Sequence, residues 1–285
     1  MSNDYNIKVL NKETTLQILL EDHNSLIRFG DGELDLIRGA SIPYQDYQPE
    51  LAGSLKELLL EGSNRRLLVG LSDVFEKLDR YNDYCRNFYQ NSFFPNNHDL
   101  LREVELQYNV YVSTFFSRPY IDLVDKSHAK DYFAKMKQLW QDRDLLIVEG
   151  KYSRSGEGND LFSNARSISR LICPPTNAYS RKKVIEDEII KNAANRLILL
   201  MLGPTAKVIV ADLIAQLNNQ MIDIGHIDSE YEWMKMGVTN KVKIPHKHTA
   251  EFNFDDKQVK LEKDDNFDKQ IISIIEPGFK IEVQH

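Results

Sequence analysis

The chain has 285 residues, of which 42% are hydrophobic and 28% are charged, and its formal net charge is −7. This composition is typical of a folded globular protein and excludes extensive disorder, and the length corresponds to one large domain or two small ones. A net negative charge argues against a surface that neutralises a long phosphate backbone, so we expect no nucleic-acid partner.

Two features of the sequence indicate the cellular compartment in which the protein resides. No apolar run approaches the roughly 18 residues of a transmembrane helix, and the chain opens with polar and acidic residues rather than a signal peptide. Its two cysteines, Cys85 and Cys173, are too few and too separated for a disulfide framework or a cysteine metal site. We therefore predict a cytoplasmic protein without a transmembrane segment. No heptad pattern appears, so the oligomeric state is left open.

Short apolar runs alternate with longer periodic segments along most of the chain. The apolar runs predict strands over residues 25–29, 67–71, 110–114, 145–148, 169–173, 197–202 and 221–224. Helical periodicity predicts helices over residues 14–22, 51–60, 74–89, 129–140, 181–194 and 206–217. Near-continuous apolar strands separated by helices are typical of a parallel sheet covered on both faces. We predict a doubly wound α/β fold with a mostly parallel sheet and helices on both faces.

The alternation of strands and helices breaks down beyond about Lys241. Apolar residues at 252, 254, 259 and 261 predict a strand or arm that packs on the main domain, and residues 271–283 predict a second addition. We therefore divide the chain into a main domain over residues 1–240 and a C-terminal extension over residues 241–285 that packs on the same domain.

Two acids follow directly after the predicted strand at 25–29. On a regular helix Asp31 and Glu33 would point about 200° apart, so they converge on one ion only if they lie in a turn. Gly30 and Gly32 supply the backbone freedom for such a turn. Two carboxylates at the carboxyl end of a strand suit Mg²⁺ or Mn²⁺ carrying a phosphate. Alternatively, Asp31 is a helix N-cap and Glu33 is an acid in the first helical turn.

The loop over residues 149–162 also follows a predicted strand. It contains three glycines with two cations nearby, and we expect it to enter a helix. Such a loop can offer backbone N–H groups and a helix N-terminus to a phosphate. It contains neither a Walker A motif nor a dinucleotide fingerprint. A mobile surface loop is the alternative interpretation.

Two more loops follow the last two predicted strands of the main domain. In residues 202–207, Gly203 makes a turn and Pro204 suits the first helical position, so free N–H groups point beyond the sheet edge; simple helix initiation explains the pattern equally well. The loop at 223–233 adds His226, Asp228 and Glu230 to the same predicted crevice. So many titratable groups after an apolar strand favour a catalytic role over a purely structural one.

Five motifs, in order along the chain, together resemble the GT-D-type glycosyltransferases, whose best-known members are bacterial enzymes that extend the glycan on serine-rich-repeat adhesins. The motifs are RFGDGE at 28–33, SRPY at 117–120, GNDLF at 158–162, LGPTA at 202–206 and DIGHIDSEYEW at 223–233. The resemblance covers about residues 25–237. It implies a Rossmann-like nucleotide-binding domain in which Asp31-Gly32-Glu33 serves a UDP-sugar and a divalent ion, Mn²⁺ or Mg²⁺.

The resemblance also implies transfer of glucose from UDP-glucose to a sugar acceptor on a glycoprotein or another surface glycan. Breaking a sugar–phosphate bond leaves charge on the departing diphosphate, which a metal ion and backbone donors stabilise. We assign Asp31 and Glu33 to the metal and the diphosphate. We expect substrate binding from Arg28, Gly30, Arg118, Gly158, Asn159, Asp160, Gly203, Pro204 and Thr205. The base that takes the acceptor proton is His226, Asp228 or Glu230, and the sequence does not choose among them.

Two other functions are compatible with the same acidic site. A phosphohydrolase or nucleotidyltransferase would release inorganic phosphate or pyrophosphate instead of UDP. A non-catalytic UDP-sugar-binding subunit of a glycosylation complex would bind UDP without turnover, and the intact pair of Asp31 and Glu33 disfavours it. Loops and appended segments commonly decide which acceptor binds, so we expect the segment after Lys241 to shape the acceptor side.

Overall fold

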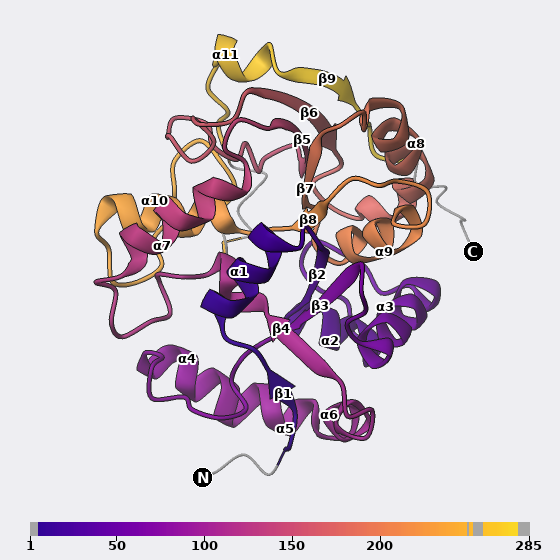
Figure 1. Cartoon of the computed structure of the whole chain (residues 1–285), viewed down its shortest axis with the longest axis vertical. Coiled ribbons are helices and arrows are strands. Elements are labelled where there is room, and N and C mark those ends of the chain that lie inside the picture. Colours follow the sequence, from indigo (N-terminus) through magenta and orange to yellow (C-terminus); the bar gives the residue numbers. More distant parts are fainter. Residues whose placement is uncertain (1–4, 250, 253–258, 279–285) are drawn as a thin grey trace, which may run out of the picture.

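The computed structural model describes residues 5–249, 251–252 and 259–278. In this part of the chain a nine-stranded sheet has the strand order β1-β4-β3-β2-β8-β7-β5-β6-β9 (Figure 1). Each strand is parallel to its neighbours. The predicted α/β fold with a mostly parallel sheet is therefore confirmed.

All seven strands that the apolar runs predicted are present. The strands are β1 (Lys8–Val9), β2 (Ser25–Phe29), β3 (Leu67–Leu71), β4 (Val110–Ser113), β5 (Asp144–Gly150), β6 (Ser167–Cys173), β7 (Leu197–Met201), β8 (Met221–Asp223) and β9 (Ile271–Ile274). The sequence analysis missed β1, which is two residues long. Strand β9 lies inside the segment 271–283, of which residues 279–283 are outside the described part.

The described α-helices are α1 (Lys12–Glu21), α2 (Asp31–Ile37), α3 (Pro49–Glu61), α4 (Asp83–Phe88), α5 (Phe94–Asn96), α6 (His98–Glu105), α7 (Ala129–Met136), α8 (Lys182–Asn192), α9 (Pro204–Leu213), α10 (Ile227–Met236) and α11 (Asp265–Asp268). Of the described helices, none has the length and apolar character needed to cross a bilayer. The prediction of one helix over 74–89 is wrong. Asn82 caps α4 by accepting from the Cys85 N–H at 2.9 Å, and the Tyr81 hydroxyl donates to Asp73, which fixes the preceding residues as a loop.

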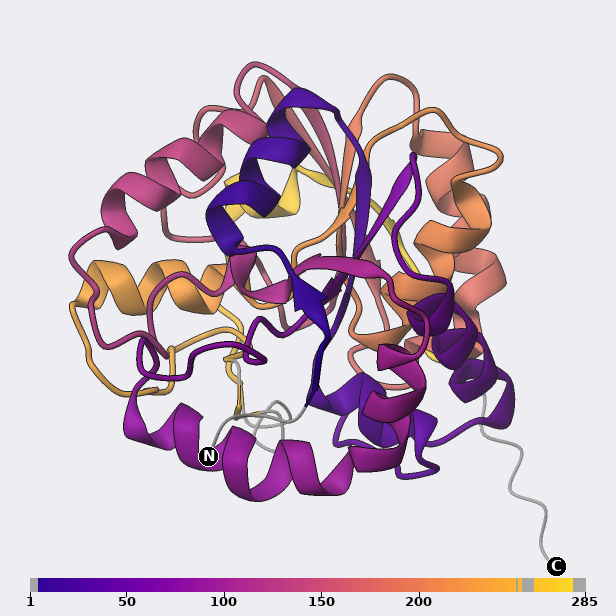
Figure 2. The ribbon, with the colours of Figure 1, turned by 60° about the horizontal axis from the view of Figure 1, so that its bottom comes forward.

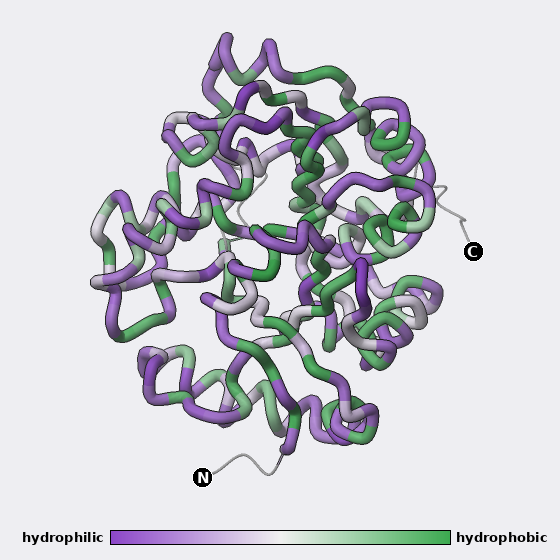
Figure 3. Tube along the Cα trace, viewed as in Figure 1, coloured by the Kyte–Doolittle hydropathy of each residue, from purple (hydrophilic) through white to green (hydrophobic). Residues whose placement is uncertain are grey.

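The sheet buries apolar side chains on both faces, as near-continuous apolar strands require. In β5, Leu145 and Ile147 belong to one core cluster and Leu146 and Val148 to the other. Helices α1, α7 and α10 cover the first face, and α3, α8 and α9 cover the second (Figure 2). Hydrophobic stretches of the trace follow the strands through the middle of the molecule (Figure 3).

Strands β2 and β8 lie side by side at the centre of the sheet, but the helices that follow them pack on opposite faces. Helix α2 contributes to the core on the side of α3 and α9, whereas α10 packs with α1 and α7. The chain therefore leaves the two strand ends in opposite directions. Such a topological switch point opens a crevice at the carboxyl ends of the strands, which is where open α/β sheets bind ligands.

The described part of the C-terminal extension packs on the main domain. Strand β9 extends the sheet beside β6, and the Phe267 ring of α11 lies between the guanidinium groups of Arg154 and Arg170, each 4.2 Å from its centroid. Of the predicted strand or arm, Val259 and Leu261 lie in no described strand and belong to an arm, and residue 254 is outside the described part. The domain boundary at residue 240 stays a prediction.

We expect Phe267→Ala to lower the free energy of unfolding by about 3 kcal/mol, because it removes a buried ring and uncovers two guanidinium groups. Urea denaturation measures this change. Leu261→Ala is the matched control in the same extension: its side chain is 37% exposed, so we expect about 0.5 kcal/mol or less. Equal losses for the two variants would contradict the packing of the extension described above.

Candidate active site

A cavity of about 380 Å³ opens at the carboxyl ends of the central strands. The loops after β2, β4, β5, β7 and β8 line it, and the segment after α10 adds His248 and Glu251. The predicted residues among its lining are Arg28, Gly30, Asp31, Glu33, Arg118, Gly203, Pro204, His226 and Asp228. This volume falls in the range of small-ligand sites. Segments far apart in the sequence therefore converge on one site at the switch point.

Asp31 and Glu33 lie in the first turn of α2 and not in an irregular turn, so that part of the sequence analysis is wrong. Gly30, rather than Asp31, is the N-cap. The Glu33 carboxylate is buried: Oε2 accepts the Gly30 N–H at 2.9 Å, and Oε1 lies 2.8 Å from the Lys207 Nζ. Asp31 faces the cavity and makes no hydrogen bond or ion pair with another described residue. The two acids thus point in different directions, as their helical spacing requires.

Lys207 joins the elements around the switch point. Its ammonium group lies 2.8 Å from the Glu33 carboxylate and 2.9 Å from the carboxylate of Asp223, and all three side chains are buried. Asp223 also binds Arg28, whose Nε donates to the Asp223 carbonyl at 2.9 Å and whose Nη2 lies 3.3 Å from Oδ1. A Cβ at Gly225, which has φ +48°, would come within 1.7 Å of the Arg28 guanidinium. The close approach therefore requires glycine.

The charges around Asp223 set its protonation state. Burial alone would raise the pKa of Asp223, but the adjacent Arg28 and Lys207 cations hold it below its usual range. Asp223 is therefore ionised at neutral pH and holds both cations. Arg28 lines the cavity, but the Ser117 hydroxyl and the Asp223 carbonyl and carboxylate already occupy much of its donor set.

Arg118 follows β4 and lines the cavity from another side. Its Nη2 lies 3.0 Å from the Asp122 carboxylate and 3.3 Å from the Glu251 carboxylate. Burial lowers the pKa of Arg118, but the carboxylates of Asp122 and Glu251 outweigh it and raise the pKa well above its usual value. Arg118 therefore stays charged and brings a fixed cation to the cavity wall.

Glu230 is buried in α10 and does not line the cavity. Its Oε2 accepts the backbone N–H groups of Tyr120 and Ile121, each at 3.0 Å. Burial raises the pKa of Glu230 to about 7, against the lowering effects of Arg118 and these two N–H groups. Through these two hydrogen bonds Glu230 positions the loop that carries Arg118.

His226 is the N-cap of α10 and lines the cavity beside His248, with ring centroids 5.3 Å apart. Burial, together with the neighbouring His248 and Arg118, lowers the pKa of His226 to about 3. The imidazole is therefore neutral at physiological pH. A neutral ring can accept a proton or a hydrogen bond from a group in the cavity.

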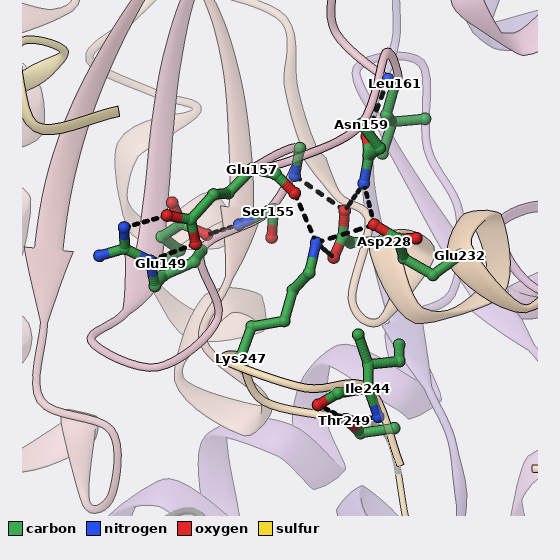
Figure 4. A network of polar contacts seen from close by, with 12 residues as sticks. Glu149, Ser155, Glu157, Asn159, Leu161, Asp228, Glu232, Ile244, Lys247 and Thr249 are labelled. Atoms are coloured by element: carbon green, nitrogen blue, oxygen red, sulfur yellow. Dashed lines mark hydrogen bonds and ion pairs between the residues drawn. The ribbon is translucent and has the colours of Figure 1, made fainter. Parts of the chain in front are cut away.

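Asp228 holds the glycine-containing loop in place (Figure 4). Its Oδ1 accepts the Gly156 N–H and the Asn159 amide, both at 2.8 Å, and its Oδ2 lies 2.9 Å from the Lys247 Nζ. Lys247 also lies 3.0 Å from the Glu232 carboxylate, and burial of its stem leaves the ammonium group among these acids. Both oxygens of Asp228 are therefore committed to the loop and to the extension.

The glycine-containing loop joins β5 to β6 without a helix, so the prediction that it enters a helix is wrong. Its first half lines the cavity through Gly150, Tyr152, Ser153 and Ser155. Its second half, residues 158–160, is not part of the lining. Asn159 binds Asp228 and Glu232, whereas the Asp160 carboxylate binds Lys137 at 2.9 Å and the Tyr231 hydroxyl at 2.9 Å. The structure thus brings to the cavity the half of the loop that the sequence did not single out.

The loop after β7 contacts the cavity through two of its three predicted residues. Gly203 has φ +50°, and a Cβ there would come within 2.6 Å of the Tyr44 ring. Pro204 is the first residue of α9, as predicted. Thr205 is fully buried and does not line the cavity.

The cavity residues that sequence reasoning missed include Tyr44, Lys207, His248 and Glu251. Lys207 follows Gly203 by four residues on α9, and this one-turn spacing is the signal that could have identified it. Nothing near Tyr44 marks it as a site residue. His248 reaches the cavity because its N–H donates to the Tyr152 carbonyl at 2.6 Å, a contact between segments nearly 100 residues apart.

Residues 26–252 match the sequence model of the glycosyltransferase GT-D fold family. The chain belongs to this family. It is 53% identical over 267 residues to the probable glycosyl transferase Gly of Streptococcus gordonii and 48% identical over 269 residues to the glycosyltransferase GlyD of Streptococcus pneumoniae. Both matches cover 94% of this chain. The chain, however, spans only 39% of the length of the first protein and 33% of the length of the second.

Solved structures give the same assignment. A structure described as a new glycosyltransferase from Streptococcus sanguinis has a TM-score of 0.91 and 51% identity, with coverage of 95% of this chain and 100% of that one. Another, described as a highly conserved domain with a distinct glycosyltransferase fold, has a TM-score of 0.88 at 51% identity and covers 95% and 96% of the two chains. The predicted GT-D family and glycosyltransferase class are therefore confirmed.

We expect the imidazole signals of His226 to stay constant between pH 8 and pH 5 in an NMR titration, because its folded pKa of about 3 lies below this window. A histidine-containing model peptide in the same buffers, whose imidazole titrates near pH 6.5, provides the reference. The spectrum of His226→Asn assigns the signal. A midpoint near 6.5 for His226 would contradict the neutral ring described above.

We expect Lys247→Met to lower the free energy of unfolding by about 3 kcal/mol, because it leaves the Asp228 and Glu232 carboxylates facing each other without a cation. Thermal and urea denaturation measure the loss. Lys235→Met is the control with the same change of charge, at an exposed pair with Asp160, where we expect less than about 1 kcal/mol. If the two variants were equally stable, Lys247 would not stabilise the loop.

Proposed function

We propose that the chain transfers a hexosyl group, with glucose as the expected sugar, from a UDP-sugar to a sugar acceptor on a glycoprotein or surface glycan, with the help of Mn²⁺ or Mg²⁺. The observation that carries the proposal is the free Asp31 carboxylate inside the switch-point cavity of a GT-D-fold chain. The names of the streptococcal relatives support the transferase activity, and the UDP-sugar follows from the family resemblance of the five motifs.

The side chains present fit a metal ion that arrives with a diphosphate. Mg²⁺ in nucleotide sites commonly takes one or two carboxylates and completes its shell with phosphate oxygens and water. Asp31 can be such a ligand, whereas both Glu33 oxygens already bind protein groups. Among the described residues no cluster of three or more metal-ligating side chains occurs. The ion would then depend on the donor for most of its ligands, and when bound it would stabilise the charge of the leaving UDP.

The electrostatics of Asp31 support a cation at this place. The surrounding cavity walls raise the pKa of Asp31 by desolvation, although the side chain stays accessible from the cavity, and the Glu251 and Glu33 carboxylates raise it further against Arg118. A divalent ion would relieve this repulsion among carboxylates. Helices α9 and α10 both begin at the cavity, so the positive ends of their dipoles favour the negatively charged diphosphate.

His226 is the base candidate that the geometry favours. It lines the cavity, whereas both oxygens of Asp228 are bonded and Glu230 lies outside the cavity lining. An acceptor hydroxyl that enters between His226 and Glu251 would find a proton acceptor there. Arg28, Arg118 and the loops at 150–155 and 203–204 would then bind the donor.

We also retain the prediction of a cytoplasmic location. Cys85 and Cys173 are both buried and unpaired, which fits a reducing compartment. Burial raises the pKa of the Cys85 thiol to about 12, and burial likewise raises that of Cys173, so neither is a reactive thiolate.

We expect Asp31→Asn to lower the rate of UDP release from UDP-glucose by about 10²-fold at saturating Mn²⁺, because an amide replaces an anionic ligand. The melting temperature without metal should hardly change, since Asp31 supports no described contact. Asp99→Asn is the control: Asp99 lies in the first turn of α6, outside the cavity lining. We expect full activity from it.

Glu33→Gln should behave differently from Asp31→Asn. It weakens the contact with the buried Lys207, so we expect a loss of about 2 kcal/mol in the free energy of unfolding together with a smaller loss of turnover. Full activity of Asp31→Asn would overturn the metal assignment. Release of inorganic phosphate or pyrophosphate in place of UDP would favour the phosphohydrolase or nucleotidyltransferase alternative.

A further inference from the structure

A second cavity of about 260 Å³ adjoins the first one. It lies between the start of α4, the residues after Arg118, and the segment that follows α10. The lining residues that matter here are Asn82, Tyr84, Asp122, Asn240, Lys241 and Glu251. Glu251 lines both cavities, so the two share a wall.

An ion-pair cluster forms that shared wall. The Glu251 carboxylate lies 3.3 Å from Arg118 and 3.2 Å from Lys241, and the Asp122 carboxylate lies 3.0 Å from Arg118 and 3.6 Å from Lys241. Two cations thus face two anions. Because these charges compensate one another, the second cavity offers no excess charge to an ionic ligand, and it suits a neutral one.

The outer side of the second cavity has an exposed aromatic ring. Tyr84 is 65% exposed, and the Lys241 ammonium group lies 4.8 Å from its ring centroid, which holds the ring at the cavity. Thr239 and Asn240 are exposed beside it, and their side chains make no hydrogen bond with another described residue. A hexopyranose has apolar C–H faces and a rim of hydroxyl groups. The C–H faces can pack against an aromatic ring, and the hydroxyl groups can form hydrogen bonds with free hydroxyl and amide side chains.

We propose that the second cavity binds a neutral sugar ring of the acceptor glycan, stacked on Tyr84 and hydrogen-bonded to Asn240. This deepens the proposed function, because an acceptor bound here reaches the donor cavity past Glu251. Its volume is smaller than the roughly 300–1,000 Å³ of pockets that enclose a drug-sized ligand, so it suits one ring at a time. The segment after α10 thereby gives the acceptor site two of its walls.

Saturation-transfer NMR with the methyl glycosides of glucose, galactose and N-acetylglucosamine tests the proposal. We expect at least one of them to receive saturation at its C–H protons from the parent protein. Tyr84→Ala should weaken this binding about tenfold, and Tyr84→Trp should retain it because it keeps an aromatic face. Tyr108→Ala is the control: Tyr108 is 84% exposed but precedes β4, at the opposite end of the sheet, and should bind like the parent.

Calorimetric titration with UDP and Mn²⁺ is measured on the same four proteins. Unchanged UDP binding together with the loss of sugar binding in Tyr84→Ala supports the acceptor site. Sugar signals that are absent in the parent, or that survive unchanged in Tyr84→Ala, overturn it. Failure of the parent to bind UDP would instead overturn the proposed donor, even where the sugar signals depend on Tyr84.

Discussion

The buried ammonium group of Lys207 is the contact on which the site depends. It neutralises Glu33 at the start of α2 and Asp223 at the end of β8, and Asp223 in turn holds Arg28 of β2. Each of these charges pays a desolvation cost that only its partners offset, so loss of one partner leaves an uncompensated charge. The network therefore fixes the carboxyl ends of the two central strands relative to α9, on the side where the crevice opens.

This network also decides what the two acids of the Asp-x-Glu motif can do. Because of the helical spacing, the side chains of Asp31 and Glu33 point in different directions, and Lys207 pairs with the buried carboxylate, that of Glu33. Asp31 remains in the cavity close to other carboxylates. Their combined negative charge repels a further anion and attracts a cation. A similar arrangement occurs across the cavity. There Asp228 is paired with Lys247 and bonded to the loop after β5, whereas His226, the N-cap of the same helix, lines the cavity.

The sequence predicted the sheet well because strands buried on both faces need uninterrupted apolar runs, and such runs are visible residue by residue. It missed α10 because polar and charged residues such as Asp228, Glu230 and Glu232 hide the helical periodicity, although each is bonded in the structure. It placed Asp31 at the carboxyl end of β2, where the cavity opens, but it did not predict the helical backbone around that residue. His248 and Glu251 could not be found, since contacts with Tyr152 and with Arg118, the latter 133 residues away, bring them to the cavity and leave no local pattern.

We propose that Asp31, and not Glu33, holds the metal at a UDP-sugar site between β2 and β8. A crystal structure of the protein with UDP and Mn²⁺ tests it most directly. We expect the diphosphate in the 380 Å³ cavity, the ion bound to an Asp31 carboxylate oxygen, and Glu33 still paired with Lys207. An ion bound by Glu33 with Lys207 displaced, or UDP bound away from this cavity, would contradict it.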